Sequence, residues 1–476
     1  MLKTIIKFSV SNIVNLFLGV LSAIVLTRAF SPTIYGTLNI FNATVATGLS
    51  ILYLGLDSSF IRFYNEPPSI DTNKELGTKL LFCSLLVTII VSLVSIFVLY
   101  NDFSTYIFGF SSRIIVCMVF VSIIAQIVLR FLNIKYRMDF NTKQFTIQAI
   151  LTQSVLKLFV IISALLAFNI EGVVSFSALS IMILAIVYSY VQRKSFFSFK
   201  NFSDYTQYKP VFKFAAFSAP LSICINLNTS LTQQIISHSL NVSSVGIYSS
   251  AGYFASILGA LQGGFSTFWS AYMYSNYRDK QENIKKINEY LLLVIIIVYA
   301  CLILGKDIVY LLIGQEYQES KSFFSMTLSY PILMLAAETT TYGIGIMKKT
   351  QYSLVCFIVS ICLNLGLAYL FIPFLGLKGA AMASMLSGLV LYISRSIIGQ
   401  KLYKSISDIR ITIIDIIAII CLALVPAFLP ERISYVAIII IVAITIILNF
   451  ERTKDLLRKF MGLLSDMKIN FGRRSR

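Results

Sequence analysis

The stretch LTRAFSPTIYGTLNIF, residues 26–41, joins two long apolar segments, and Arg28 ends the first of them. An arginine is costly inside a lipid bilayer, so its position in an otherwise apolar run needs an explanation. The whole chain is apolar: 57% of its 476 residues are hydrophobic, 13% are charged and the mean hydropathy is +0.82. In a soluble chain about a quarter of the residues are charged. The composition therefore predicts an integral membrane protein.

Apolar stretches long enough to cross a membrane recur along the whole sequence, because a helix of about 20 residues spans the hydrocarbon core. The first is expected to persist as a spanning helix, since its apolar core is longer than that of a signal peptide and no small-residue cleavage site follows it. The sequence thus predicts an all-α polytopic membrane protein. The fourteen predicted spans cover residues 5–30, 38–64, 76–100, 112–134, 146–168, 172–192, 211–237, 246–275, 288–312, 322–347, 352–373, 378–400, 411–429 and 433–450.

Basic residues orient the predicted spans, because Lys and Arg concentrate on the cytoplasmic side of membrane proteins. With the N-terminus in the cytoplasm, 32 of the 39 Lys and Arg residues fall at cytoplasmic ends, six fall on the opposite side, and Lys157 lies inside a span. Both termini are therefore predicted to be cytoplasmic. The net charge of +18 is assigned to loops facing anionic membrane lipids and not to nucleic acid. Residues 451–476 are predicted to form a basic amphipathic tail at the membrane surface.

Catalytic signatures are missing from the sequence. There is no phosphate-binding P-loop, no GxSxG elbow and no DxD pair, and the longest polar connections, near 193–210 and 276–287, are short. The seven cysteines lie in apolar stretches without a CxxC pair, and one histidine, His238, cannot form a zinc site alone. The protein is expected not to be an enzyme and to need no metal or other cofactor.

Ionisable residues inside the spans are the candidates for function, since such residues normally face a cavity or a partner. Lys157 and Glu338 lie deepest, near the centres of their spans. For Glu338 a hydrogen bond to the neighbouring Thr339–Thr341 cluster is an alternative role. Other candidates lie nearer span ends, where a long side chain can also extend to the headgroups. These are Arg28, Asp57, Arg62, Arg130, Arg395 and Asp415.

The stretch around Arg28 recurs later in the chain. RAFSPTIYGTLNIF (28–41) aligns with HSLNVSSVGIYSSA (238–251), which pairs Arg28 with His238 and Gly36 with Gly246. Both glycines are predicted to lie in short loops between long helices. KFSVSNIVN (7–15) likewise matches KFAAFSAPL (213–221). The repeat predicts two six-helix lobes in the same orientation around a central cavity, residues 1–200 and 201–404, followed by two further helices in 405–450.

Three motifs carry a resemblance to a known family: the spacing of Arg28, Pro32, Tyr35 and Gly36, the stretch LGLDSSFIRFYN (54–65) and the stretch LGLKGAAMAS (375–384). With them, nearly the whole chain resembles bacterial polysaccharide flippases of the multidrug/oligosaccharidyl-lipid/polysaccharide exporter superfamily. The resemblance implies a V-shaped pair of lobes in the bacterial inner membrane. It implies transfer of an undecaprenyl-pyrophosphate-linked oligosaccharide to the outer leaflet by alternating access, for O-antigen, capsule or a similar polysaccharide. A polysaccharide polymerase and a chain-length regulator are the implied partners.

A pyrophosphate-linked glycan cannot cross hydrocarbon unaided, so a wet cationic groove is expected. Arg28 is predicted at its outer mouth, opposite His238, with Arg62 at the cytoplasmic mouth and Lys157 in the passage between. Glu338 is the candidate for coupling to an ion, and Asp57 is expected to face a basic group elsewhere. The predicted substrate-binding residues are Arg28, Arg62, Arg130, Lys157 and His238.

Two other functions remain open at this point. An ion-coupled multidrug and toxin extrusion antiporter would share the architecture, but its cation site needs acidic residues, and this chain buries more bases than acids. A membrane polysaccharide polymerase or ligase would show similar hydropathy. Such enzymes typically carry a large external loop, which is not found here.

Overall fold

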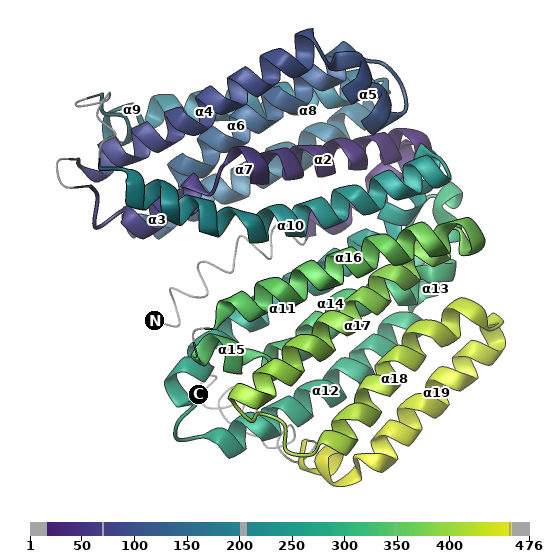
Figure 1. The fold of residues 1–476 in the computed structure, drawn as a ribbon. Coiled ribbons are helices and arrows are strands. Elements are labelled where there is room, and N and C mark those ends of the chain that lie inside the picture. The colour runs from purple at the N-terminus through teal and green to yellow at the C-terminus, as the bar shows by residue number, and fades with distance from the viewer. Residues whose placement is uncertain (1–16, 69–70, 200–206, 348, 457, 459–476) are drawn as a thin grey trace, which may run out of the picture. The chain divides into compact units, whose positions relative to one another are not determined.

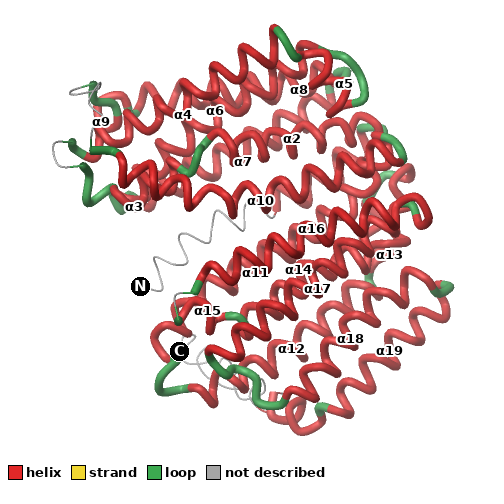
Figure 2. Tube along the Cα trace, viewed as in Figure 1, coloured by secondary structure: helices red, strands yellow, loops and turns green. Residues whose placement is uncertain are grey.

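The computed structural model describes residues 17–68, 71–199, 207–347, 349–456 and 458. Within these ranges the chain forms helices joined by short turns, without a strand (Figure 2). The predicted all-helical membrane fold is therefore confirmed. Most of the predicted amphipathic tail lies outside the described residues, as do residues 5–16 of the first predicted span.

The predicted spans all have helical counterparts in the described part of the chain (Figure 1). A bent pair, α2 (Pro32–Leu52) and α3 (Leu56–Phe63), is together long and apolar enough for one span. The spans predicted at 5–30 and 322–347 correspond to a shorter apolar helix, Phe17–Ala29, and to α14 (Phe324–Thr340) with α15 (Tyr342–Ile346). Eleven single helices are long and apolar enough to cross a membrane: α4 (Asn73–Phe97), α6 (Arg113–Met138), α7 (Thr142–Leu165), α8 (Ile170–Val191), α10 (Lys209–Ser239), α11 (Val242–Asn276), α12 (Gln281–Leu304), α16 (Thr350–Leu375), α17 (Leu377–Leu402), α18 (Ile409–Phe428) and α19 (Glu431–Leu448).

Short helices follow several of the spans. They are α5 (Tyr100–Phe108), α9 (Arg193–Phe196), α13 (Lys306–Leu312) and the 3₁₀ segment η1 (Gln315–Phe323). The helices assemble into two compact units. The first contains Met1–Ile257, Leu312–Ser320 and Ile361–Ala380, and the second contains the remaining residues. The predicted lobes, 1–200 and 201–404, stay a prediction.

The second predicted span, 38–64, is broken between α2 and α3, whose axes differ by 52°. Gly55 sits at the break with a positive φ of 71°. A Cβ atom at this position would lie 2.3 Å from the carbonyl oxygen of Ala215 in α10. Glycine is therefore needed twice over, for the backbone conformation and for the close approach of α10. Figure 1 shows α10 running beside α2 and α3 in the first unit.

The repeat glycines Gly36 and Gly246 lie in the first turns of α2 and α11, so their predicted placement in loops was wrong. Pro32 begins α2, where its missing N–H costs nothing and its fixed φ suits the helix. A Cβ on Gly36 would lie 2.1 Å from the carbonyl oxygen of Val242, and one on Gly246 would lie 2.1 Å from that of Pro32. Val242 and Pro32 are separated by the same 210 residues as the glycines. The contact is thus reciprocal, as a two-fold relation between the repeats requires.

A second reciprocal exchange joins the repeats in the first unit. The Thr27 hydroxyl accepts a hydrogen bond from the backbone N–H of Gly314 at 3.4 Å. In turn, Nε2 of Gln234 donates to the carbonyl oxygen of Ile107 at 3.2 Å. The two side chains are 207 residues apart, and so are the two backbone groups. The segment 312–320 therefore packs with the N-terminal half of the chain because each repeat extends a segment to the other.

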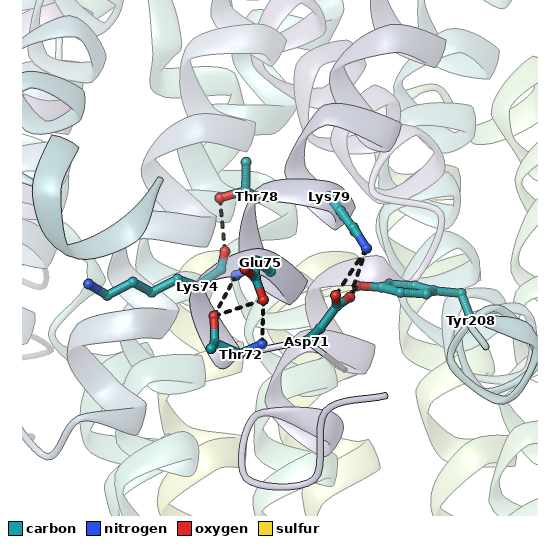
Figure 3. A network of polar contacts seen from close by, with 7 residues as sticks. All are labelled: Asp71, Thr72, Lys74, Glu75, Thr78, Lys79 and Tyr208. Atoms are coloured by element: carbon teal, nitrogen blue, oxygen red, sulfur yellow. Dashed lines mark hydrogen bonds and ion pairs between the residues drawn. The ribbon is translucent and has the colours of Figure 1, made fainter. Parts of the chain in front are cut away.

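A buried ion pair ties the connection before α4 to the start of α10 (Figure 3). Nζ of Lys79 lies 2.9 and 3.2 Å from the two carboxylate oxygens of Asp71, and the hydroxyl of Tyr208 donates to the same carboxylate. The side chains of Lys79 and Asp71 are only 1% and 5% exposed. Beside them, Thr72 and Glu75 form a capping box that begins α4.

Candidate functional site

A half-open cavity of about 250 Å³ lies in the first unit. It is lined by the helix Phe17–Ala29 together with α2, α6, α7 and α11. Lys157 is the one charged side chain among the described residues that line it. The other lining residues are uncharged polar (Ser22, Asn42, Gln126, Gln153 and Tyr253) or apolar (Leu26, Leu38, Val45, Ala46, Leu49, Leu156 and Val160).

Helical periodicity explains why these side chains meet. On α7 the lining residues are Gln153, Leu156, Lys157 and Val160, and Leu156 and Lys157 each lie three or four residues from Gln153 and from Val160, so all four share one face. Opposite them, a Cβ on Gly19 would lie 3.4 Å from Nζ of Lys157. The glycine brings the backbone of the helix Phe17–Ala29 close to the lysine. Of the predicted substrate-binding residues, Lys157 is thus placed at a cavity by the structure.

Three amide side chains line the cavity beside Lys157. Asn42, Gln126 and Gln153 make no side-chain hydrogen bond within the described part of the chain. Each amide offers one carbonyl acceptor and two N–H donors. Polar groups in a membrane-embedded bundle are normally hydrogen-bonded, so these amides can bind water or a ligand with donors and acceptors. The cavity thus combines one positive charge with mixed hydrogen-bonding groups.

Arg28 and His238 lie outside this cavity, in the region where the repeats exchange segments. Nε of Arg28 donates to the carbonyl oxygen of Leu312 at 2.9 Å. The ring of His238 lies 5.0 Å from that of Tyr106 in α5. Both residues therefore have contacts within the protein. Their predicted pairing by pseudo-symmetry stays a prediction.

The remaining basic candidates of the first unit form ion pairs away from the cavity. Nη1 of Arg62 lies 2.9 Å from Oε2 of Glu66, and the two side chains are 52% and 70% exposed. Nη2 of Arg130 in α6 lies 3.2 Å from Oδ2 of Asp57 in α3. Arg130 is thus the basic group that faces Asp57, which the sequence alone did not identify.

Glu338 belongs to the second unit, where it lies on α14. Its Oε1 accepts a hydrogen bond from Nε2 of Gln262 on α11 at 2.8 Å. The neighbouring threonines bond elsewhere: Thr339 to Asn288, Thr340 to Ser396 and Thr341 to a carbonyl of its own helix. The carboxylate of Glu338 therefore bonds a glutamine on another helix and not the threonine cluster.

Comparisons with known proteins agree at the level of fold. No family model and no curated protein matches the sequence. Among solved structures, the lipid II flippase MurJ in an inward closed conformation superposes with a TM-score of 0.70 and 15% identity, covering 96% of this chain and 100% of that one. An inward-facing multidrug resistance MATE transporter of the MOP superfamily superposes with a TM-score of 0.61 and 15% identity, covering 81% of this chain and 93% of that one. An outward-facing MATE transporter of the same superfamily superposes with a TM-score of 0.54 and 16% identity, covering 84% of this chain and 95% of that one.

The chain has the fold of MOP-superfamily transporters. At 15–16% identity the superpositions show this fold and leave the cargo open. The resemblance to polysaccharide flippases stays a prediction, because a lipid II flippase and multidrug transporters both share this fold.

The neutral members of the cavity were not predicted, because only a charged residue in mid-span stands out in the sequence. A signal was present in one case, because Gln153 precedes Lys157 by four residues and so shares its helical face. Asn42 and Gln126 carry no such signal, since only the packing of α2 against α6 and of α6 against α7 brings them to the lysine.

Proposed function

We propose that the protein is a flippase that moves an undecaprenyl-pyrophosphate-linked oligosaccharide from the cytoplasmic to the outer leaflet of the bacterial inner membrane. The cavity around Lys157 carries this proposal. An ionisable group among membrane helices is expensive, so a lysine that shares a cavity with three amide side chains favours an anionic cargo rich in hydroxyl groups. The likeness in fold to MurJ, a lipid II flippase, supports a lipid-linked cargo.

In this proposal the polyprenyl tail stays in the bilayer while the polar headgroup occupies the protein interior. Lys157 and the cavity amides replace water around part of the glycan, and Arg28, Arg62, Arg130 and His238 attract the anionic head along its path. Both termini face the cytoplasm, and the two repeat lobes alternate access to either side. The glycan serves O-antigen, capsule or exopolysaccharide synthesis, with a polymerase and a chain-length regulator as neighbours.

An ion-coupled multidrug antiporter is the second candidate. The fold likeness to MATE transporters supports it equally, and Glu338 with Gln262 provides an acidic group that a cation could use. Proteoliposomes containing the purified protein separate the two candidates. If the protein is a flippase, we expect it to transfer a labelled lipid-linked glycan to the far leaflet. If it instead extrudes organic cations against an ion gradient and transfers no glycan, the protein is an antiporter.

Substitution of Lys157 tests the cavity directly. Lys157→Met is expected to slow glycan transfer by at least about tenfold, because a lost charge-assisted hydrogen bond of roughly 1.5–3 kcal/mol corresponds to that factor or more. Lys143→Met is the matched control, since Lys143 lies exposed near the start of the same helix. Initial transfer rates in proteoliposomes, normalised to folded protein, give the comparison. Equal rates for the two variants would contradict the role of Lys157.

Glu338 is proposed to couple transfer to an ion. In wild type, an imposed pH or sodium gradient is then expected to change the transfer rate severalfold. Glu338→Gln retains a hydrogen-bonding group toward Gln262 but cannot ionise, so its rate is expected to be independent of the gradient. Gln262→Leu serves as a comparison that keeps the carboxylate. A Glu338→Gln protein that responds to the gradient like wild type would remove Glu338 from this role.

A further inference from the structure

We propose that Arg395 in the second unit binds a phosphate group of the lipid-linked cargo, and that Glu338 competes with this phosphate for the guanidinium. The inference rests on the flippase proposal and assigns one residue to the anionic end of the cargo. Three observations support it. Arg395 has no acceptor, Glu338 lies nearby without pairing with it, and the helices that carry the two residues are in close contact.

Arg395 lies in α17 and is only partly exposed. Within the described part of the chain it forms no hydrogen bond and no ion pair, and its Nε atom is buried without a partner. Its guanidinium carbon lies 5.3 Å from the centroid of the Phe357 ring. Arg452, the other described arginine that is not exposed, has two acceptors, Asn449 and Glu289. The remaining described arginines whose side chains lack an acceptor are all exposed: Arg113, Arg137, Arg193, Arg410, Arg432 and Arg458.

Glu338 on α14 is the acidic side chain whose charge acts on Arg395. The two side chains form no ion pair, because Oε1 of Glu338 accepts a hydrogen bond from Nε2 of Gln262 on α11 at 2.8 Å. Opposite charges attract strongly in a low-dielectric interior, so a direct pair would be favourable if no other anion bound the guanidinium. A phosphate on Arg395 would meet the like charge of Glu338. The two anions therefore compete for one guanidinium.

The helices α14 and α17 are in close contact beside both residues. The hydroxyl oxygens of Thr340 and Ser396 lie 2.6 Å apart. A Cβ on Gly399 would lie 2.4 Å from the carbonyl oxygen of Thr340. Thr340 is two residues from Glu338, and Ser396 is adjacent to Arg395. The backbones that carry the two charged groups are thus fixed, and rotation of side chains decides whether the groups pair.

A phosphate is the anion that suits this site. The guanidinium presents N–H donors in a planar fork, which can bind two phosphate oxygens through parallel hydrogen bonds. Tyr330 and Tyr342 lie close enough to act on the same guanidinium, and their hydroxyls can donate to further phosphate oxygens. A cation would be repelled by Arg395. Phosphates occur both in the lipid-linked cargo and in ordinary phospholipids, and the proposal assigns the cargo.

The experiment measures binding of radiolabelled undecaprenyl pyrophosphate, without a sugar, to the full chain in phosphatidylcholine nanodiscs. Arg395→Met is expected to weaken binding by about tenfold or more, the factor of one lost charge-assisted hydrogen bond. Arg395→Lys keeps the charge but not the fork, so its affinity is expected to lie between the two. Arg410→Met is the matched control, because Arg410 is exposed at the start of α18, and it is expected to bind like wild type.

Substitution of Glu338 tests the competition. Glu338→Gln is expected to strengthen binding of undecaprenyl pyrophosphate severalfold, since a neutral amide no longer competes for the guanidinium or repels the phosphate. In an Arg395→Met background the same substitution is expected to change the affinity less, because the group for which the two anions compete is absent. A purely structural role of Arg395 would not produce this dependence. Equal effects of Glu338→Gln in both backgrounds would contradict the competition.

Three results would overturn the inference or its basis. Folded Arg395→Met that binds undecaprenyl pyrophosphate like wild type would remove Arg395 from cargo binding. Loss of binding when phosphatidylglycerol replaces phosphatidylcholine would assign the site to ordinary anionic phospholipid. In both cases, transfer of a lipid-linked glycan by wild type in proteoliposomes would leave the flippase proposal standing. Wild type that neither binds undecaprenyl pyrophosphate nor transfers the glycan would end both proposals.

Discussion

Asp71→Ala is expected to destabilise the protein by about 3–5 kcal/mol, the usual cost of removing one partner from a buried ion pair. The carboxylate bonds both Lys79 and Tyr208, and the ion-paired side chains are almost fully enclosed. Its loss leaves the ammonium of Lys79 buried without that counter-charge. The thermal unfolding midpoint of the purified protein, followed by helical circular dichroism, measures the effect.

The control for this prediction is the exposed pair of Arg62 with Glu66. Glu66→Ala is expected to cost under about 1 kcal/mol, because exposed ion pairs contribute little. The double variant Asp71→Leu with Lys79→Met is expected to recover most of the stability lost in Asp71→Ala, since it leaves no unpaired charge. An Asp71→Ala protein no less stable than Glu66→Ala would show that the pair is not buried as described.

Gly246→Ala is expected to destabilise the contact between α2 and α11 by about 1–3 kcal/mol, as overpacking does. The new methyl group would meet the carbonyl oxygen of Pro32, which belongs to the backbone and cannot rotate away. Gly252, six residues further along the same helix, provides the matched control. A Cβ there meets nothing within 4 Å, so Gly252→Ala is expected to be neutral or slightly stabilising.

The reciprocal geometry adds a second test of the same contact. Gly36→Ala is expected to cost as much as Gly246→Ala, because Gly36 meets Val242 as Gly246 meets Pro32. The double variant is expected to cost less than the two single effects combined, since one separation of the helices relieves both clashes. Equal melting points for Gly246→Ala and Gly252→Ala would mean that the two helices do not cross at the glycines.

The spans were predictable because the bilayer imposes one length on every apolar helix. The position at which a span breaks was harder to predict. The run 38–64 is apolar enough throughout to suggest one helix. It bends at Gly55, where α10, over 150 residues away in the sequence, approaches too closely for a side chain. Gly36 and Gly246 were misplaced for a related reason. Glycine is common both in turns and at close helix crossings, and only the partner helix distinguishes the two.

The site was predictable in its charge and not in its surroundings. Lys157 was identified because a lysine in mid-span is costly. The amides that complete the cavity are neutral and lie on three helices. Only Gln153 is marked by a local pattern, its four-residue spacing from Lys157. The environment of Lys79 was not predictable. Its position in the sequence predicts a basic residue at the cytoplasmic end of a span, and only the packing of residues 71–79 against Tyr208 buries it.

Site-specific photo-crosslinking tests most directly whether the glycan enters the Lys157 cavity. A photoreactive residue is placed at Gln153, which lines the cavity, or at Leu158, which is 40% exposed on the same helix. Each protein is then illuminated in proteoliposomes with a radiolabelled lipid-linked glycan, and the cross-linked product is digested to separate attachment through the glycan from attachment through the lipid tail. The account predicts glycan attachment at position 153 and not at position 158. Attachment of the glycan at position 158 alone, or at neither position while transfer proceeds, would contradict it.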